Sequence, residues 1–462
     1  MTATEPPSPH AHGAGADPLV PYPDHAMFVA MRHSGHEAAM QGLWIYERPI
    51  DMEAIERFHD NLGRGLLGRL IEPSTLPFGR YRWVNAPRSR ATLQIATTAR
   101  ERGKLYEWAD EQVALPLDPE TGPGWRLGVQ PLTDGSTAVS LVATHCIADG
   151  GGVVISALEA INGISRDLGY PDRRSRSRFR SVAAELKQTR RDLPEVVRTL
   201  GKAVCVARRR RGAVPRATGV KLDVRASTDD QRVVVPTVSV FVDTEQWNAK
   251  AQQLSGNSFS LVAGFAGRVA ANLGRIRGSD GAVTLMIPVN ERDGLTDTGG
   301  NVVAIANVSL DPDLVVTDLT ASRSAIREAL KTARETPDEM IELLPLLPFL
   351  PKRLFSRMAD AAFGFTTDLP VSCSNLGQLP AQALAIDGTA AQYVCFRGID
   401  RQVTREALER RGGLLTVASG VIGGRVVISV ISYQVGGDNS PAALQSVIAK
   451  TLDEFALGAD II

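Results

Sequence analysis

The sequence contains few cysteines, few histidines beyond residue 59 and no long apolar run. No stretch reaches the roughly 20 consecutive apolar residues that a membrane-spanning helix needs. The four cysteines are scattered without metal-ligand spacing, which excludes a zinc motif and predicts a reducing, cytoplasmic setting. His145 is the only histidine after His59, so imidazole chemistry in the rest of the chain depends on it.

Several catalytic motifs are also missing. The chain has no G-x-S-x-G elbow, no H-E-x-x-H pair and no G-x-x-x-x-G-K-[ST] loop. These absences exclude a serine hydrolase of the α/β type, a zincin protease and a P-loop nucleotidase.

Composition and periodicity predict an ordinary globular protein. Its 462 residues are 44% hydrophobic and 22% charged, which suggests two domains or a few with their own cores. Residues 1–20 are rich in Pro, Ala and Gly and predict a disordered tail. Asp51 is the expected cap of a helix. Strands are predicted at Gln41–Tyr46, Arg126–Val129, Ala138–Ala143, Thr237–Val242, Val283–Val289, Val302–Leu310, Tyr393–Arg397, Leu414–Ala418 and Val426–Tyr433, and helices at Phe259–Leu273 and Pro441–Phe455.

The most informative stretch follows the strand Ala138–Ala143. His145 and Asp149 lie in this stretch, and the three glycines after Asp149 are predicted to begin a helix. Imidazole is the side chain best suited to general base work near neutral pH. Asp149 could fix the turn by binding backbone amides or a cation. The alternatives are a buried histidine satisfied by a carbonyl and an aspartate that only caps the helix.

The H-x-x-x-D-G pattern of His145–Gly150 resembles the signature of the condensation-domain and CoA-dependent acyltransferase superfamily. Ile287–Arg292 with Gly299–Asn301 resembles the later P-V-x-x-R…G-N segment, and Ser374–Gly377 resembles the S-N-x-G turn. The resemblance extends over nearly the whole chain from about Pro21. Thr144 replaces the first of two histidines found in many members, and the D-F-G-W-G segment of plant BAHD enzymes is absent.

The resemblance implies an α/β (α+β) fold of two chloramphenicol-acetyltransferase-like lobes, with mixed sheets flanking a central tunnel. The lobes would be residues 21–170 and 231–462, and residues 171–230 would connect them. It implies that the protein is an acyltransferase with His145 as general base and Asp149 as structural support. Arg292 would pair with Asp149, although the sequence alone equally allows a solvated arginine.

Gly150, Asn375 and Gly377 are the expected substrate-binding residues, with Asn375 as a hydrogen-bond donor. The alternative for Asn375 is an asparagine that stabilises its own turn. The donor would be acyl-CoA or a phosphopantetheine thioester, and the expected acceptor is lipid-like. The direct transfer that the resemblance implies needs no nucleophilic residue, so we expect no bound metal and no bound cofactor. Two alternatives remain open: a condensation enzyme fed by an acyl carrier protein, and an inactive relative that binds a carrier or a lipid.

Charge is strongly segregated although the whole chain is neutral. Arg173–Arg216 contains fifteen basic residues and three acids, a net of +12, which leaves −12 for the remainder. A helix is predicted here to start at Asp192, with Pro194 in its first turn. The segment could be a solvated linker, or could bind an anionic membrane at its inner face, the CoA phosphates or an acidic carrier protein. Nucleic acid is disfavoured because no aromatic residues interleave the arginines.

A second unusual stretch, Met340–Pro351, is apolar and broken by prolines. It is too short to span a bilayer. Packing between the lobes is one explanation. A lipid-facing mouth beside an acyl tunnel is the other.

Overall fold

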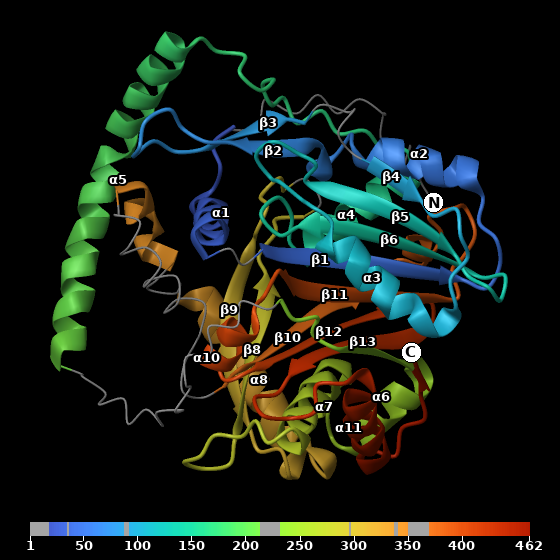
Figure 1. The fold of residues 1–462 in the computed structure, drawn as a ribbon. Coiled ribbons are helices and arrows are strands. Elements are labelled where there is room, and N and C mark those ends of the chain that lie inside the picture. Colours follow the sequence, from blue (N-terminus) through green and yellow to red (C-terminus); the bar gives the residue numbers. More distant parts are fainter. Residues whose placement is uncertain are drawn as a thin grey trace, which may run out of the picture.

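A computed structural model describes residues 18–34, 37–86, 92–212, 232–294, 297–336, 341–349 and 369–462. Two mixed β-sheets dominate it (Figure 1). The first sheet has the strand order β11 (Tyr393–Arg401), β1 (Glu37–Tyr46), β6 (Thr137–Thr144), β5 (Trp125–Pro131) and β4 (Thr92–Ile95). The second has the order β14 (Asp460–Ile461), β7 (Thr237–Asp243), β13 (Arg425–Tyr433), β12 (Leu414–Ile422), β10 (Val371–Gln378), β8 (Val283–Asn290) and β9 (Val303–Leu310). A small ribbon consists of β2 (Arg69–Glu72) and β3 (Arg82–Asn85).

The helices are distributed over both halves of the chain. Those of the first half are α1 (Tyr22–Ser34), α2 (Met52–Leu62), α3 (Leu105–Ala114), α4 (Gly150–Ile161) and α5 (Arg178–Gly212). Those of the second half are α6 (Thr244–Gln253), α7 (Ser258–Asn272), α8 (Thr320–Glu335), α10 (Arg405–Arg410) and α11 (Pro441–Glu454). Short 3₁₀ turns are η1 (Leu66–Gly68), η3 (Arg102–Lys104), η4 (Leu314–Val316), η5 (Ile341–Phe349) and η6 (Ala381–Leu384). Among the described helices, none is both long and apolar enough to cross a bilayer.

The first sheet is packed on both faces. Asp51 caps α2, accepting from the amides of Glu53 and Ala54, and the helix buries Ile55 and Phe58 against this sheet. On the other face, α3 packs against β1 and β6. The strand before the motif, β6, is buried along its whole length, as expected for a strand covered on both sides.

One strand belongs to the opposite half of the chain. β11 pairs antiparallel with β1 from Glu37–Arg401 to Ile45–Tyr393, so the range 231–462 contributes an edge to the first sheet. A shared apolar cluster joins Leu43 and Ile45 of β1 to Phe241 of β7. The sheets are therefore connected through their cores as well as by the chain.

The predicted strands and the predicted helices over Phe259–Leu273 and Pro441–Phe455 are confirmed within a few residues. The predicted start of the basic helix is wrong, because α5 begins at Arg178 and contains Asp192 and Pro194 in its interior. Val20, assigned to the tail, is fully buried and bonds Tyr81, so the ordered chain includes residues 18–20. Residues 1–17 and 213–231 lie outside the described residues.

The described part of the apolar stretch, Ile341–Phe349, packs against α1 and α5. Leu343, Leu346 and Leu347 are buried there, and the Phe349 ring stacks on Phe78 at 6.2 Å. This placement favours the packing explanation. Met340, Leu350 and Pro351 lie outside the described residues.

Candidate active site

His145 lies in the turn between β6 and α4, held by its backbone from both sides. Its amide donates to the carbonyl of Ala38 at 2.9 Å, one residue into β1. Its carbonyl accepts from Nδ2 of Asn301 at 3.0 Å, just before β9. The strand-to-helix turn predicted from the glycines is therefore present, and the second half of the chain fastens it.

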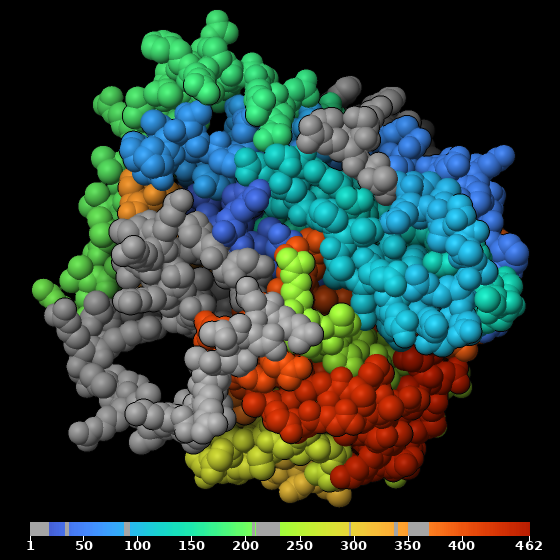
Figure 2. All heavy atoms as spheres, viewed as in Figure 1, coloured from blue at the N-terminus to red at the C-terminus, as the bar shows by residue number. Residues whose placement is uncertain are grey.

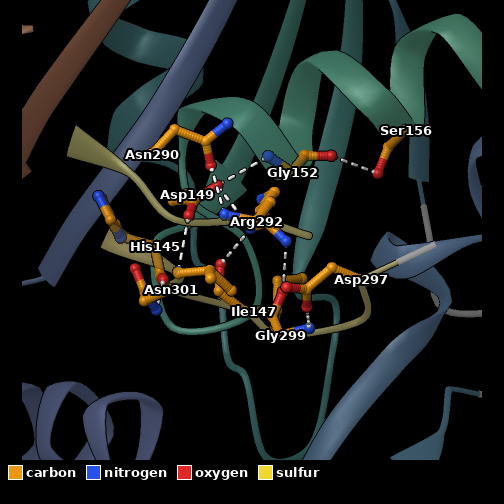
Figure 3. A network of polar contacts seen from close by, with 12 residues as sticks. His145, Ile147, Asp149, Gly152, Ser156, Asn290, Arg292, Asp297, Gly299 and Asn301 are labelled. Carbon is orange, nitrogen blue, oxygen red and sulfur yellow. Dashed lines mark hydrogen bonds and ion pairs between the residues drawn. The ribbon is translucent and has the colours of Figure 1, made fainter. Parts of the chain in front are cut away.

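The imidazole of His145 has no hydrogen-bond partner among the described residues. Nδ1 is buried without one, and the ring points away from the Asp149–Arg292 pair (Figure 3). Buried polar groups are normally satisfied, so an unpaired ring nitrogen is a position where a bound molecule can be recognised. The alternative of a histidine ring satisfied by a carbonyl is not what the structure shows.

Both carboxylate oxygens of Asp149 bind groups other than the His145 ring. Oδ1 accepts from the amide of Gly152 at 2.7 Å, which caps α4, and forms an ion pair with Nη2 of Arg292 at 2.7 Å. Oδ2 accepts from the amide of Val302 at 3.0 Å. The helix cap and the cation partner were alternatives from the sequence, yet one carboxylate does both because its two oxygens accept several bonds.

Arg292 is buried, with 2% of its side chain exposed. Nη1 donates to the carbonyl of Gly299 and Nη2 to that of Gly300, each at 3.0 Å. A Cβ at Gly152 would lie 3.3 Å from Nη2, so the glycine permits this approach. The solvated arginine considered from the sequence is not observed, and the Asp149–Arg292 pair joins the two halves.

A second set of buried charges reinforces the same junction, and sequence reasoning missed it. Asp24 of α1 accepts from the amides of Gly300 and Asn301, at 3.0 and 2.6 Å, and from Nδ2 of Asn301 at 2.7 Å. Burial raises the pKa of the Asp24 carboxyl above its ordinary value, against the opposing effects of the nearby Arg69 and these hydrogen bonds. Asn301 thus connects Asp24 to the carbonyl of His145.

Arg69, the first residue of β2, connects the two loops directly. Nη2 donates to the carbonyl of Ile147 at 2.6 Å, and Nη1 donates to the carbonyl of Thr298. The guanidinium lies 4.1 Å from the Trp83 ring centre. The residue types gave no signal for Asp24 or Arg69. The one sequence hint was the Gly300–Asn301 pair, where a Cβ at position 300 would lie 2.8 Å from Asp24.

The remaining predicted site residues lie at β10. Ser374–Gly377 lies in β10, where the register of the pairing with β12 shifts between Asn375 and Gln378, so the predicted turn forms a bulge within this strand. Oδ1 of Asn375 accepts from the amide of Gly377 at 2.8 Å, which is the self-stabilising alternative. The bulge lies against the motif, because a Cβ at Gly150 would be 3.1 Å from Leu376.

The neighbouring cysteine is not a candidate nucleophile. Cys146 is fully buried, and burial raises the pKa of its thiol far above the ordinary value. A thiol must ionise to act as a nucleophile. Cys146 is a core residue.

Comparison with solved structures places this geometry in a known architecture. The first condensation domain of the calcium-dependent antibiotic synthetase, solved with a substrate analogue, superposes with a TM-score of 0.55 at 14% identity, covering 95% of this chain and 96% of that one. The fold is that of the condensation domains. The wax ester synthase/diacylglycerol acyltransferase of Marinobacter aquaeolei VT8 gives 0.53 at 14% identity, over 95% and 98%. Polyketide synthase associated protein 5 of Mycobacterium tuberculosis gives 0.52 at 14% identity, over 93% and 96%.

No protein-family model and no curated protein matches the sequence. The structural likeness confirms the predicted two-lobed α/β fold of the condensation domains and the acyltransferases compared with them. At these identities it establishes the fold alone.

Proposed function

We propose that the protein is an acyltransferase that moves an acyl group from acyl-CoA to a hydroxyl of a lipid-like acceptor. The observation that carries this proposal is the His145 imidazole, unpaired on a turn that both halves of the chain hold in place. A general base needs a fixed position and a nitrogen that no protein group occupies. The fold, shared with a wax ester synthase, supports the same reaction class.

In the proposed reaction, His145 takes the proton from the acceptor hydroxyl as its oxygen attacks the thioester carbonyl carbon. The new carbon–oxygen bond gives a tetrahedral oxyanion. Its collapse breaks the carbon–sulfur bond, and the imidazolium returns the proton to the departing thiolate. General base catalysis contributes about 10²–10⁴-fold, so the positioning of the two substrates in the predicted tunnel supplies much of the rest.

Asp149 and Arg292 act on this reaction through the turn. Their oxygens and nitrogens bind backbone groups of the motif and the Gly299–Val302 loop, so they are positioning residues. Gly150, Asn375 and Gly377 are proposed to border the substrate, because the β10 bulge lies against the start of α4. Nδ2 of Asn375 would donate to the oxyanion or the acceptor, while its Oδ1 accepts from the Gly377 amide.

The decisive experiment measures thiol release from a panel of acyl-CoAs with mixed alcohol and amine acceptors. We expect acceptor-dependent release that falls at least 100-fold in His145→Ala. His59→Gln is the matched control, since its ring packs on Trp125 in the first sheet, and it should retain activity. Equal release by wild type and His145→Ala would refute the general base. Asn375→Ala with unchanged kinetics would remove Asn375 from the site.

A second candidate is a condensation enzyme that receives its acyl group from a phosphopantetheine carrier protein. The fold match to a condensation domain favours it. No thiol release from any CoA thioester, together with turnover of an acyl-loaded carrier protein, would favour this candidate. No reaction with either acyl-CoA or the loaded carrier protein would favour an inactive relative that binds a carrier or a lipid.

A further inference from the structure

The exposed face of α5 carries a continuous apolar stripe. Phe179 is 84% exposed, and the other members are 49–59% exposed. At 100° per residue, all of them fall within an arc of about 60° over a length of about 37 Å. The stripe consists of Phe179, Leu186, Leu193, Val197, Leu200 and Val204.

This stripe is not the face that packs on the protein. The inward face buries Ser181, Val196 and Thr199, about 120° around the helix from the stripe. Glu185, also inward, accepts from the hydroxyls of Ser74 and Thr75, at 2.8 and 2.7 Å. A row of half-exposed apolar side chains is typical of a surface that binds another protein or a membrane.

Basic side chains run beside the stripe. Arg180, Lys187, Arg191 and Arg198 share the flank away from the body of the protein and form no ion pair among the described residues. The whole helix has eleven Arg and Lys against three acids, a net charge of +8. Glu185 and Asp192 lie on the inward side, and the exposed Glu195 is the one acid beside the outer flank, which therefore keeps a net positive charge.

We propose that α5 docks the protein on an anionic lipid surface. A helix with leucine and phenylalanine along one line and arginine and lysine beside it inserts its apolar side chains between headgroups, while the cations meet the lipid phosphates. The helix stands at the margin of the molecule, so its stripe can meet a flat surface (Figures 1 and 2).

Arg190 distinguishes a membrane from a partner helix. The stripe has a seven-residue repeat, but Arg190 occupies one of the positions that a coiled coil would fill with an apolar side chain. In a coiled-coil seam the Arg190 charge would be buried without a partner. At a membrane its long side chain extends to the headgroups. A second copy of the chain would also bring two cationic helices together.

Flotation of the full-length protein with vesicles tests the proposal and needs no acyl transfer, so it is independent of the proposed reaction. We expect binding to vesicles of phosphatidylcholine with phosphatidylserine and little binding to phosphatidylcholine alone. Arg191→Gln/Arg198→Gln should weaken partitioning about 25-fold, since each basic residue contributes about fivefold. Leu193→Gln/Val197→Gln/Leu200→Gln should weaken it about tenfold or more.

The matched control is Arg323→Gln/Arg327→Gln, which removes two exposed charges from α8 and should leave binding unchanged. No binding to anionic vesicles, or equal binding by all the α5 variants, would overturn the proposal. A dimer in light scattering that the triple apolar variant dissociates would overturn it in favour of self-association. Strong binding to an acidic carrier protein without vesicle binding would overturn it as well.

A fluorescent label reports insertion directly. Cys205 is the exposed cysteine, and Cys146, Cys373 and Cys395 are buried. In a Cys205→Ser background, an environment-sensitive dye on Leu193→Cys should shift to the blue with anionic vesicles. The same dye on Arg323→Cys should not shift. Equal spectra with and without vesicles at position 193 would contradict insertion.

Discussion

At the scale of single residues, Asp149 shows how one side chain can hold a turn in place without contacting the His145 ring. Its carboxylate caps α4, binds the Val302 amide and pairs with Arg292, all among buried groups. Removing one member of such a pair leaves an uncompensated buried charge, which is costlier than the loss of an exposed pair.

Arg292→Ala should therefore lower the free energy of unfolding by about 3–5 kcal/mol, measured by urea denaturation. The same change at Arg410, whose pair with Glu406 is exposed, should cost at most about 0.5 kcal/mol. Acyl transfer should fall in Arg292→Ala and stay unchanged in Arg410→Ala. A variant at Arg292 with wild-type stability and activity would show that the pair is not a clamp.

At the scale of elements, α1 is the helix that sequence reasoning could not connect to the site. It places Asp24 under the Gly300–Asn301 loop and His25 against Tyr81, with ring centres 4.0 Å apart. Burial, with a smaller effect from Arg80, lowers the pKa of His25 to about 4 from 6.5. Between pH 6.5 and pH 4, the unfolded chain therefore binds a proton at His25 that the folded chain does not bind. The contribution of His25 to the free energy of unfolding is fully present above pH 6.5 and is lost as the pH falls toward 4.

We expect His25 to account for about 2 kcal/mol of the stability lost between pH 7 and pH 5. His25→Gln cannot titrate, so its free energy of unfolding should depend less on pH across this interval. Urea titrations of both proteins at the two pH values measure the difference. Parallel pH profiles would mean that His25 is accessible to protons in the folded protein.

The same elements show how far the sequence could lead. The strand, turn and helix around His145 and Asp149 were predictable because their signals are local: an apolar run, a cap and three glycines. The partners Asp24 and Arg69 were not, because an ordinary aspartate and arginine acquire their roles through contacts with residues 78 to 277 positions away in the chain. The start of α5 was misplaced because Asp192 and Pro194 signal a helix start, whereas the helix continues through them.

At the scale of the whole molecule, the two sheets are joined through β11. Arg397 on this strand is fully buried and donates to Gln41 of β1, Asp110 of α3 and Thr237 of β7. Arg397 thus binds strands of both sheets. Unfolding of either sheet would leave the Arg397 guanidinium with buried donors that have no partner. The lobes are expected to unfold as one cooperative unit.

Fluorescence and circular dichroism can test this cooperativity. Four of the five tryptophans lie in the first half, and Trp247 lies in the second. In Trp247→Phe, fluorescence reports the first half of the chain alone, while far-ultraviolet circular dichroism reports both halves. The two urea transitions should coincide. Transitions at clearly different urea concentrations would show that the lobes unfold independently.

The pairing of β1 with β11 also bears on how the protein is made. Gln41 and its partner Arg397 are 356 residues apart in the chain. At the usual rate of synthesis, about 5–20 residues per second, the ribosome needs about 20–70 s to produce the second after the first. Throughout that interval β1 has an unpaired edge, so the nascent chain should be a client of the chaperones that shield such edges during translation.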